Sequence, residues 1–261
     1  MFRLTPAVRN LILVNVALFF LQGMFPLLTV YGSLHPIGSA LLYPWQFVTY
    51  MFLHDGLGHL FSNMITLLFF GASLEDEWGG KKFITFWLIC GLGAGFIYEG
   101  VRYYELREMN ESRLAFHEQP SGVGFADFFR EHLPQAGDSY APVARQMQKT
   151  PDDQRLIDSA TQTIDSIYME VMDSPNSGML GASGAVFGIL FALAYLFPNQ
   201  KMFIFPIPVP ISIWLYVFLF SAYSLWKGVH PTPGDNVAHF AHLGGMLIGF
   251  IVLKVWERRG I

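Results

Sequence analysis

Six long runs of apolar residues divide the chain, and short polar connections join all but one pair of them. The runs cover about 8–31, 57–74, 83–98, 179–197, 211–226 and 237–255. A helix rises about 1.5 Å per residue, so runs of this length come close to crossing a hydrocarbon core of about 30 Å. Because backbone polar groups in lipid must be satisfied within the segment, helices are the predicted element. The pattern predicts an all-α, polytopic membrane protein with a six-transmembrane-helix bundle.

The connection at 100–177 is the exception, because it is long and holds 13 acidic and 7 basic residues. Within it, Thr150 followed by Pro151 is typical of a helix start. Apolar residues then recur at helical spacing: Leu156, Ala160, Ile164, Ile167 and Val171. The sequence predicts a soluble helical insertion between the third and fourth helices. It divides the chain into 1–99, 100–177 and 178–261, the outer two parts forming the membrane core.

The amino-acid composition also indicates that most of the chain lies in a lipid bilayer rather than in water. Hydrophobic residues make up 52% of the chain and charged residues 14%, whereas a soluble domain carries roughly a quarter charged residues. Disordered, collagen-like and nucleic-acid-binding chains are thereby excluded. A single cysteine, Cys90, leaves neither an internal disulfide nor a cysteine-based zinc site.

Basic residues in the short connections predict the orientation. With the N-terminus inside, these residues lie on the cytoplasmic side: Arg3, Arg9, Lys81, Lys82, Lys201, Lys254, Arg258 and Arg259. Lys227 is then the only basic residue in a short outer loop, which fits the positive-inside rule. We therefore expect both termini in the cytoplasm and the insertion outside. No small-residue cleavage site closes the first run, so we expect a retained helix rather than a signal peptide.

Polar residues inside the spans mark the candidate chemistry, because each is unfavourable in lipid without a partner or a function. His59 and Asn63 are four residues apart and share one helix face. Ser183 opens the fourth span and His239 opens the sixth. Each of these helices runs inward from the outer side, so we expect the polar groups to meet at one depth.

Such a meeting point suits nucleophilic catalysis. A serine hydroxyl needs a base to take its proton, and histidine acts as one near neutral pH. Ser183 beside His239 would supply both groups. The Ser183 N–H, the Asn63 amide and the His59 ring would supply donors to an oxyanion. Asp235 lies in a loop, so a dyad is expected rather than a triad.

Other readings of the same residues stay open at this point. Ser183 between small residues is typical of helix packing. His239 and His242 also suit a metal site or a proton relay, and His59 and Asn63 suit hydrogen bonds between helices.

The motifs resemble those of the rhomboid family of intramembrane serine proteases. The matching elements are Gly181-Ala182-Ser183-Gly184, Ala238-His239 leading into Gly244-Gly245 and Gly249, and His59-Leu60-Phe61-Ser62-Asn63. The resemblance implies that Ser183 is the nucleophile, that His239 is the base and that His59 and Asn63 bind the oxyanion. It implies supporting places for His54 and Gly181, and at most a supporting place for His242, whose position varies in the family. Gln46 after Trp45 departs from the family's common Trp-Arg pair.

The sequence thus predicts a serine endopeptidase that cleaves transmembrane segments of membrane proteins in the lipid bilayer. We expect no cofactor, no metal and no nucleic-acid partner, and a location in a bacterial plasma membrane. A catalytically inactive rhomboid-like binding factor is the main alternative, and a histidine-based transporter or metal protein is a second. The insertion is expected to act as an outer lid that tunes access.

Overall fold

The computed structural model describes residues 4–202, 210–230 and 238–260. Helices dominate it, and two short antiparallel strands are the strands of the described part. The elements of the first half are α1 (Pro6–Met24), α2 (Leu27–Gly32), α3 (Gln46–Thr49), a 3-10 turn (Tyr50–Phe52), α4 (Leu57–Thr66), a π-helical turn (Leu67–Gly71), α5 (Ala72–Trp78) and α6 (Gly80–Glu118). Those of the second half are α7 (Gly122–His132), a 3-10 turn (Pro134–Ala136), α8 (Gly137–Lys149), α9 (Gln154–Asp173), α10 (Ser183–Leu196), β1 (Lys201–Met202), β2 (Ile211–Ser212), α11 (Ile213–Val229) and α12 (His239–Arg259).

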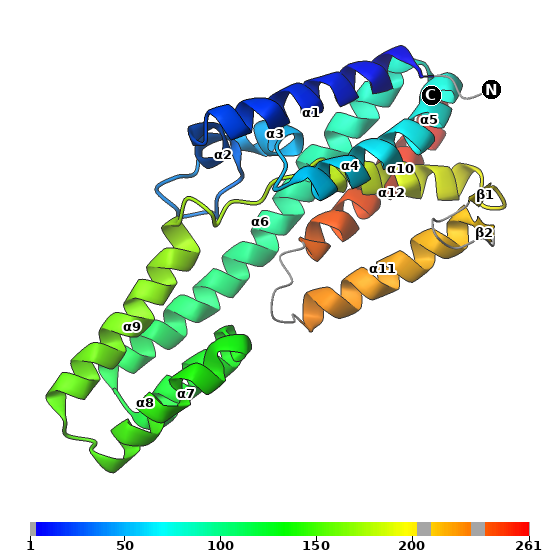
Figure 1. The fold of residues 1–261 in the computed structure, drawn as a ribbon. Coiled ribbons are helices and arrows are strands. Elements are labelled where there is room, and N and C mark those ends of the chain that lie inside the picture. The colour runs from blue at the N-terminus through cyan, green and yellow to red at the C-terminus, as the bar shows by residue number, and fades with distance from the viewer. Residues whose placement is uncertain (1–3, 203–209, 231–237, 261) are drawn as a thin grey trace.

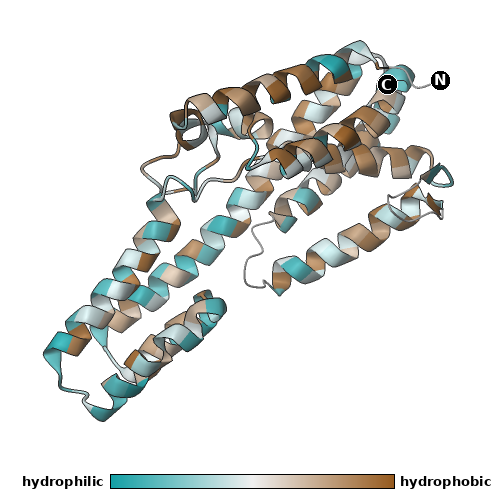
Figure 2. Cartoon of the chain, viewed as in Figure 1, coloured by the Kyte–Doolittle hydropathy of each residue, from teal (hydrophilic) through white to brown (hydrophobic). Residues whose placement is uncertain are grey.

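Length and composition confirm a polytopic membrane protein. Within the described residues, four helical stretches are long and apolar enough to cross a membrane: Pro6–Met24, Leu57–Trp78, Gly80–Glu118 and His239–Arg259. The helices α10 and α11 are also apolar but shorter. These six occupy the six predicted runs. Figure 2 shows them as mostly hydrophobic, in contrast to the hydrophilic helices at the far end of the molecule.

The first predicted span is wrong in one respect, because it is not a single helix. The helix α1 ends at Met24, and α2 starts after Pro26. Proline has no N–H to donate to the preceding turn and its ring clashes with it, so a helix usually ends before it. The chain turns here, and the segment from 27 onward belongs to the first connection.

Close backbone contact holds the centre of the bundle together. The helices α6, α10 and α12 pack against one another. A Cβ atom at Gly245 would overlap the carbonyl oxygen of Gly184, and one at Gly188 would lie 2.6 Å from Cys90 Sγ. Glycine is therefore required where α10 meets its neighbours, as is common when small residues let membrane helices approach.

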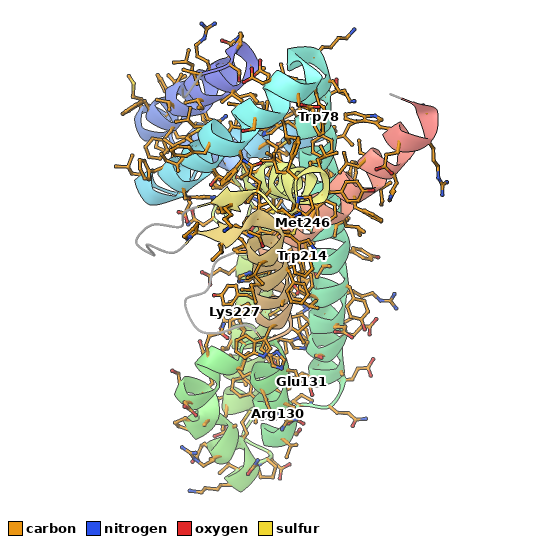
Figure 3. The ribbon with its side chains drawn as sticks, turned by 90° about the vertical axis from the view of Figure 1, so that its right-hand side faces the viewer. Trp78, Arg130, Glu131, Trp214, Lys227 and Met246 are labelled. Atoms are coloured by element: carbon orange, nitrogen blue, oxygen red, sulfur yellow. The ribbon has the colours of Figure 1, made fainter. Side chains whose placement is uncertain are left out.

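The helix α6 carries the chain from the core into the insertion without a break. It is 39 residues long, and its distal half packs with α7 and α9, which in turn pack with α8 (Figure 1). These helices enclose a second apolar cluster, formed by Met109, Phe116, Phe125, Phe128, Phe129, Ala144, Met147, Ala160 and Ile164. In the side view of Figure 3, Trp78 lies at one end of the molecule and Arg130 and Glu131 at the other.

The predicted helix start at Thr150 is wrong by three residues. Thr150 ends α8, and its hydroxyl donates back to the Gln146 carbonyl at 3.0 Å. Asp153 is the N-cap of α9, since its carboxylate accepts from the N–H groups of Arg155 and Leu156. A carboxylate is a better cap than a hydroxyl already engaged elsewhere. The predicted apolar face of α9 does pack into the second cluster.

Candidate functional site

The polar residues singled out above gather where three core helices begin. The helices α4, α10 and α12 all start at the end of the bundle that faces away from the two chain termini (Figure 1). His59 lies in the first turn of α4, Ser183 is the first residue of α10, and His239 is the first residue of α12. The exposed N–H groups at a helix start favour negative charge. This end of the bundle therefore suits a reaction in which an anion develops.

Gly181 sets the backbone that leads into Ser183. Its φ angle is +131°, a region that side-chain-bearing residues rarely adopt. Its N–H donates to the Tyr50 carbonyl at 2.9 Å, which ties this segment to the chain just before α4. A Cβ atom at Gly181 would lie 2.7 Å from His59 Cε1. Glycine is thus needed both for the turn and for the close approach of the His59 ring.

Ser183 hydrogen-bonds to His242. The Nε2 atom of His242 lies 2.8 Å from Ser183 Oγ. The His242 ring is buried against Phe187, with ring centroids 4.4 Å apart, and it lies 6.0 Å from Phe220. Phe187 of α10 and Phe220 of α11 therefore hold the His242 imidazole in place beside the Ser183 hydroxyl.

The expectation that Ser183 lies beside His239 needs correction. Three residues along a helix amount to about 4.5 Å of axial rise, and the deeper histidine, His242, is the one that reaches the serine. The His239 ring lies edge-on to Tyr223 at 5.9 Å and 6.3 Å from the His242 ring. Counting residues inward from the ends of the apolar runs places a side chain only to within about one helical turn. It therefore does not distinguish His239 from His242. His242, expected to have at most a supporting place, is the histidine in contact with the serine.

Asn63 and His59 occupy the face of α4 predicted for them. Asn63 is buried, and its Nδ2 donates to no acceptor among the described residues. A buried donor without an acceptor is unfavourable. An oxygen atom placed beside it would therefore be bound well. The contact between His59 and Gly181 brings the imidazole to the segment that carries the serine.

His54 lies behind this pair, at the turn before α4. It is buried, and its ring meets the His59 ring edge-on at 5.1 Å. Neither ring nitrogen of His54 has a hydrogen-bond partner among the described residues. Sequence reasoning placed His54 at the mouth of this helix, and the structure adds its contact with His59.

The first connection is tied to the serine segment. Leu34 and Met179 form an antiparallel bridge with two hydrogen bonds of 2.8 Å. Gln46 is fully buried and holds the same connection together with neutral hydrogen bonds, accepting from His35 N–H and donating to the Tyr31 and Leu41 carbonyls. An uncharged amide thus anchors the loop without the ion pair that an arginine would form.

The insertion also contacts this connection. Asp173, the last residue of α9, accepts a hydrogen bond from Ala40 N–H at 2.9 Å. A Cβ atom at Gly38 would lie 2.6 Å from Met172 Cε, and the φ angle of Gly38 is +100°. The end of α9 therefore packs directly on the loop that pairs with the serine segment.

The described residues of this site do not form a cluster of metal ligands. Within the described ranges, no group of three or more His, Cys, Asp or Glu side chains is placed to hold a metal ion. The histidines contact one another by ring edges, as with His54 and His59.

Comparison with known proteins identifies a family whose model matches this chain. Residues 42–105 and 159–258 match the family model described as Rhomboid domain. The matched stretches include His59, Asn63, Ser183, His239 and His242, and the unmatched stretch between them falls in the insertion.

Relatives are found in fungi, plants and bacteria. An uncharacterized mitochondrial rhomboid protein of Schizosaccharomyces pombe is 27% identical over 226 residues, which are 83% of this chain and 53% of that protein. RHOMBOID-like protein 2 of Arabidopsis thaliana is 38% identical over 53 residues, 20% of this chain and 17% of the relative. Rhomboid protease AarA of Providencia stuartii is 29% identical over 105 residues, 37% of each chain. The chain therefore spans about half the length of the fungal relative and less of the others.

Proposed function

The chain belongs to the rhomboid family, and we propose that it is an intramembrane serine endopeptidase with Ser183 as nucleophile and His242 as general base. The observation that carries the proposal is the 2.8 Å contact between Ser183 Oγ and His242 Nε2. A nucleophile in hydrogen-bond contact with its base is the diagnostic arrangement of this chemistry. One relative, AarA, is described as a rhomboid protease, which supports a hydrolase.

The dyad moves one proton in each half of the reaction. As Ser183 Oγ attacks the carbonyl carbon of the scissile peptide bond, His242 Nε2 accepts the hydroxyl proton. The same nitrogen then donates that proton to the leaving amine, and the C–N bond breaks. Water, deprotonated by His242, hydrolyses the resulting ester and restores Ser183. No described acceptor meets His242 Nδ1, so we propose a dyad without an orienting carboxylate.

Three donors are our candidates for binding the oxyanion. Ser183 N–H is the first of α10, where orphan N–H groups and the helix dipole favour negative charge. Asn63 Nδ2 is buried and carries an unused donor, and the His59 ring contacts Gly181 beside the serine. Preorganised donors of this kind typically contribute a factor of about 10²–10³ each in rate. The His54 ring contacts the His59 ring, and Gly181 leaves room for the His59 ring beside the serine segment.

We assign His239 a place at the mouth of the site rather than the role of base. Its ring packs against Tyr223 of α11 and lies next to the ring of His242. In this position it lies beside His242, the residue that we propose moves the proton.

The substrates that we propose are membrane proteins, cleaved in or next to a transmembrane segment. The site lies within the apolar bundle, at the helix ends nearest the insertion (Figure 1). The two ends of the chain lie together at the opposite end of the bundle, where basic residues such as Arg9 and Arg258 also lie. By the positive-inside rule we propose that this opposite end is cytoplasmic. The matched relatives include bacterial and mitochondrial proteins, so the comparisons do not support the predicted bacterial plasma membrane.

Three variants in liposomes test the function. With a transmembrane substrate, we expect Ser183→Ala and His242→Ala to lose cleavage and His239→Ala to retain most of it. A serine-directed fluorophosphonate should label the wild type and not Ser183→Ala. Equal cleavage by the wild type and Ser183→Ala would contradict a serine protease. Loss in His239→Ala with full activity in His242→Ala would restore His239 as the base. An inactive binding factor would show no Ser183-dependent cleavage at all.

A further inference from the structure

Gln22 is a buried amide in the otherwise apolar end of α1, and only 9% of it is exposed. A polar side chain at such a position is unfavourable unless its hydrogen bonds are made. The side chain of Gln22 makes three. Its Oε1 accepts from His54 N–H at 3.0 Å, and its Nε2 donates to the His54 carbonyl at 3.3 Å and to Thr29 Oγ1 at 3.0 Å.

The two hydrogen bonds to His54 use both backbone groups of one residue. An amide side chain that donates to a carbonyl and accepts from the N–H of the same residue holds that residue as a neighbouring strand would. Among side chains of this length only glutamine can do both, because glutamate is acceptor-only when ionised and methionine offers only a weak acceptor. The bonded residue lies 32 positions along the chain, so the clamp joins α1 to the turn that precedes α4.

A short chain of contacts leads from the clamp to the nucleophile segment. The His54 ring meets the His59 ring edge-on at 5.1 Å, and His59 Cε1 lies where a Cβ atom of Gly181 would clash. A shift of the His54 backbone would therefore move the His54 ring, against which the His59 ring packs. That ring faces the segment that leads directly into Ser183.

We propose that Gln22 is a positioning residue for His59: by clamping the His54 backbone it fixes the His54 ring, and this ring holds the His59 imidazole against Gly181. The proposal rests on the proposed function, in which His59 binds the oxyanion. Gln22 makes no contact with the reacting atoms in this account and acts only through the two histidines. A misplacement of about 1 Å in such a donor can lower a rate by about 10²-fold.

The alternative is that Gln22 only stabilises the fold by joining α1 to α4. A stabilising role predicts less folded protein, with normal turnover by the molecules that remain folded. A positioning role predicts a lower kcat with nearly unchanged KM, and an effect that depends on His59. The two roles therefore separate in kinetics and in a double-mutant cycle.

The variant is Gln22→Met, which keeps the volume and removes the clamp. The matched control is Asn15→Leu, which removes another buried amide of α1 whose side-chain Nδ2 bonds to the Leu11 carbonyl of its own helix. In liposomes with a transmembrane substrate, we expect Gln22→Met to lower kcat about tenfold with KM changed less than about twofold. Asn15→Leu should leave kcat within about twofold. In a His59→Ala background, Gln22→Met should add a loss of less than about twofold.

A second measurement keeps the inference testable if the chain proves to have no protease activity. With histidines labelled with nitrogen-15, the ring signals of His54 and His59 should shift in Gln22→Met and stay in place in Asn15→Leu. Unshifted ring signals would overturn the clamp whatever the activity. In an active enzyme, a full tenfold loss in the His59→Ala background would also overturn it, since Gln22 would then act by another route. Wild-type protein without Ser183-dependent cleavage, but with shifted ring signals, would refute the proposed function and leave the clamp standing.

Discussion

The two apolar clusters of this chain bring their helices together in different ways, although both bury aromatic rings such as Trp87 and Phe125. In the membrane core, glycines bring backbones into contact, as Gly184 and Gly245 do between α10 and α12. In the insertion, large rings fill the interior, with Phe129 stacked on Tyr140 at 4.1 Å and Phe125 edge-on to Phe129 at 5.0 Å. The solvent explains the difference. Water drives large apolar side chains inward, whereas lipid gives no such drive and leaves close packing and hydrogen bonds to hold helices together.

Charged groups also have different roles in the two regions, although the end of α12 carries an exposed ion pair between Lys254 and Glu257. The insertion carries ion pairs such as Arg107 with Glu111 and Arg113 with Asp165. In the core, Glu75 is buried and accepts from the Ala7 and Val8 N–H groups at 2.8 Å, so that its charge caps the start of α1. Exposed pairs contribute little to stability, while a buried carboxylate that caps a helix fixes where the helix lies. Charge therefore provides solubility in one region and position in the other.

The largest effect that we expect comes from Gly245→Val, which would disrupt the close backbone contact in the membrane core. A Cβ atom there overlaps the Gly184 carbonyl, and backbone cannot yield without separating α10 from α12. Because Gly184 follows Ser183, we expect turnover by the folded fraction to fall about 10²-fold, measured with a transmembrane substrate in liposomes. Gly137→Val in the insertion is the control, since nothing lies within 4 Å of its added Cβ. Equal activities of the two variants would show that close backbone contact is not what holds the core.

Much of the core was predictable from the pattern because lipid makes hydrophobicity nearly continuous along each span. The six runs coincide with the six apolar helical stretches of the structure. The pattern could not show the break at Pro26 in advance, since a proline in a membrane span can also be tolerated as a kink. It also could not show that α6 continues as one helix to Glu118, because the composition changes midway while the helix does not.

The candidate site was predictable to about one helical turn. Motif and depth predict a site where α4, α10 and α12 begin, but they do not decide between His239 and His242. Which of two histidines three residues apart reaches a serine depends on how far α12 slides along α10. In the structure Gly184 and Gly245 meet at this offset, and the sequence shows both glycines without showing that they are in contact. Gln22 was missed because an isolated amide in an apolar run does not reveal what it binds.

A smaller effect is expected from removing the insertion. Replacing residues 104–172 with a Gly/Ser linker keeps Asp173 and its hydrogen bond to Ala40 N–H. The first apolar cluster draws no member from the replaced residues, so we expect the core to remain folded. Cleavage of a small peptide should stay within about threefold of the wild type, less than 1 kcal/mol on the barrier.

Full-length membrane substrates provide the contrast for that deletion. If the insertion acts as an outer lid, their cleavage should change while peptide cleavage does not, because only a long ectodomain must pass it. Measured side by side in liposomes, a proportional change in both substrates would argue against a lid. Unfolding of the core or loss of peptide cleavage would show that the two clusters are one structural unit.

The smallest expected effect is the sensitivity of the insertion to acid. Burial lowers the pKa of His132 below its ordinary value of 6.5, against the opposing influence of Glu131 and Glu108. Burial alone would raise the pKa of Asp165, but hydrogen bonds from His117 and Arg113 outweigh it and lower that pKa below 3.8. In both cases the unfolded chain binds the proton first, so folding loses stability as the pH falls between the unfolded and folded pKa values.

The histidine and the aspartate should therefore act in separate windows. As the pH falls below 6.5, the stability linked to His132 is lost, and below 3.8 the part linked to Asp165 follows as the pH passes through its folded pKa. Hydrogen exchange of peptides from α7 and α8 should speed up in the first window, while peptides from α10 serve as the reference from the core. His132→Gln should remove the first step and Asp165→Asn the second. Exchange in α7 and α8 that is independent of pH, after correction for the intrinsic rate, would mean that neither group is linked to folding of the insertion.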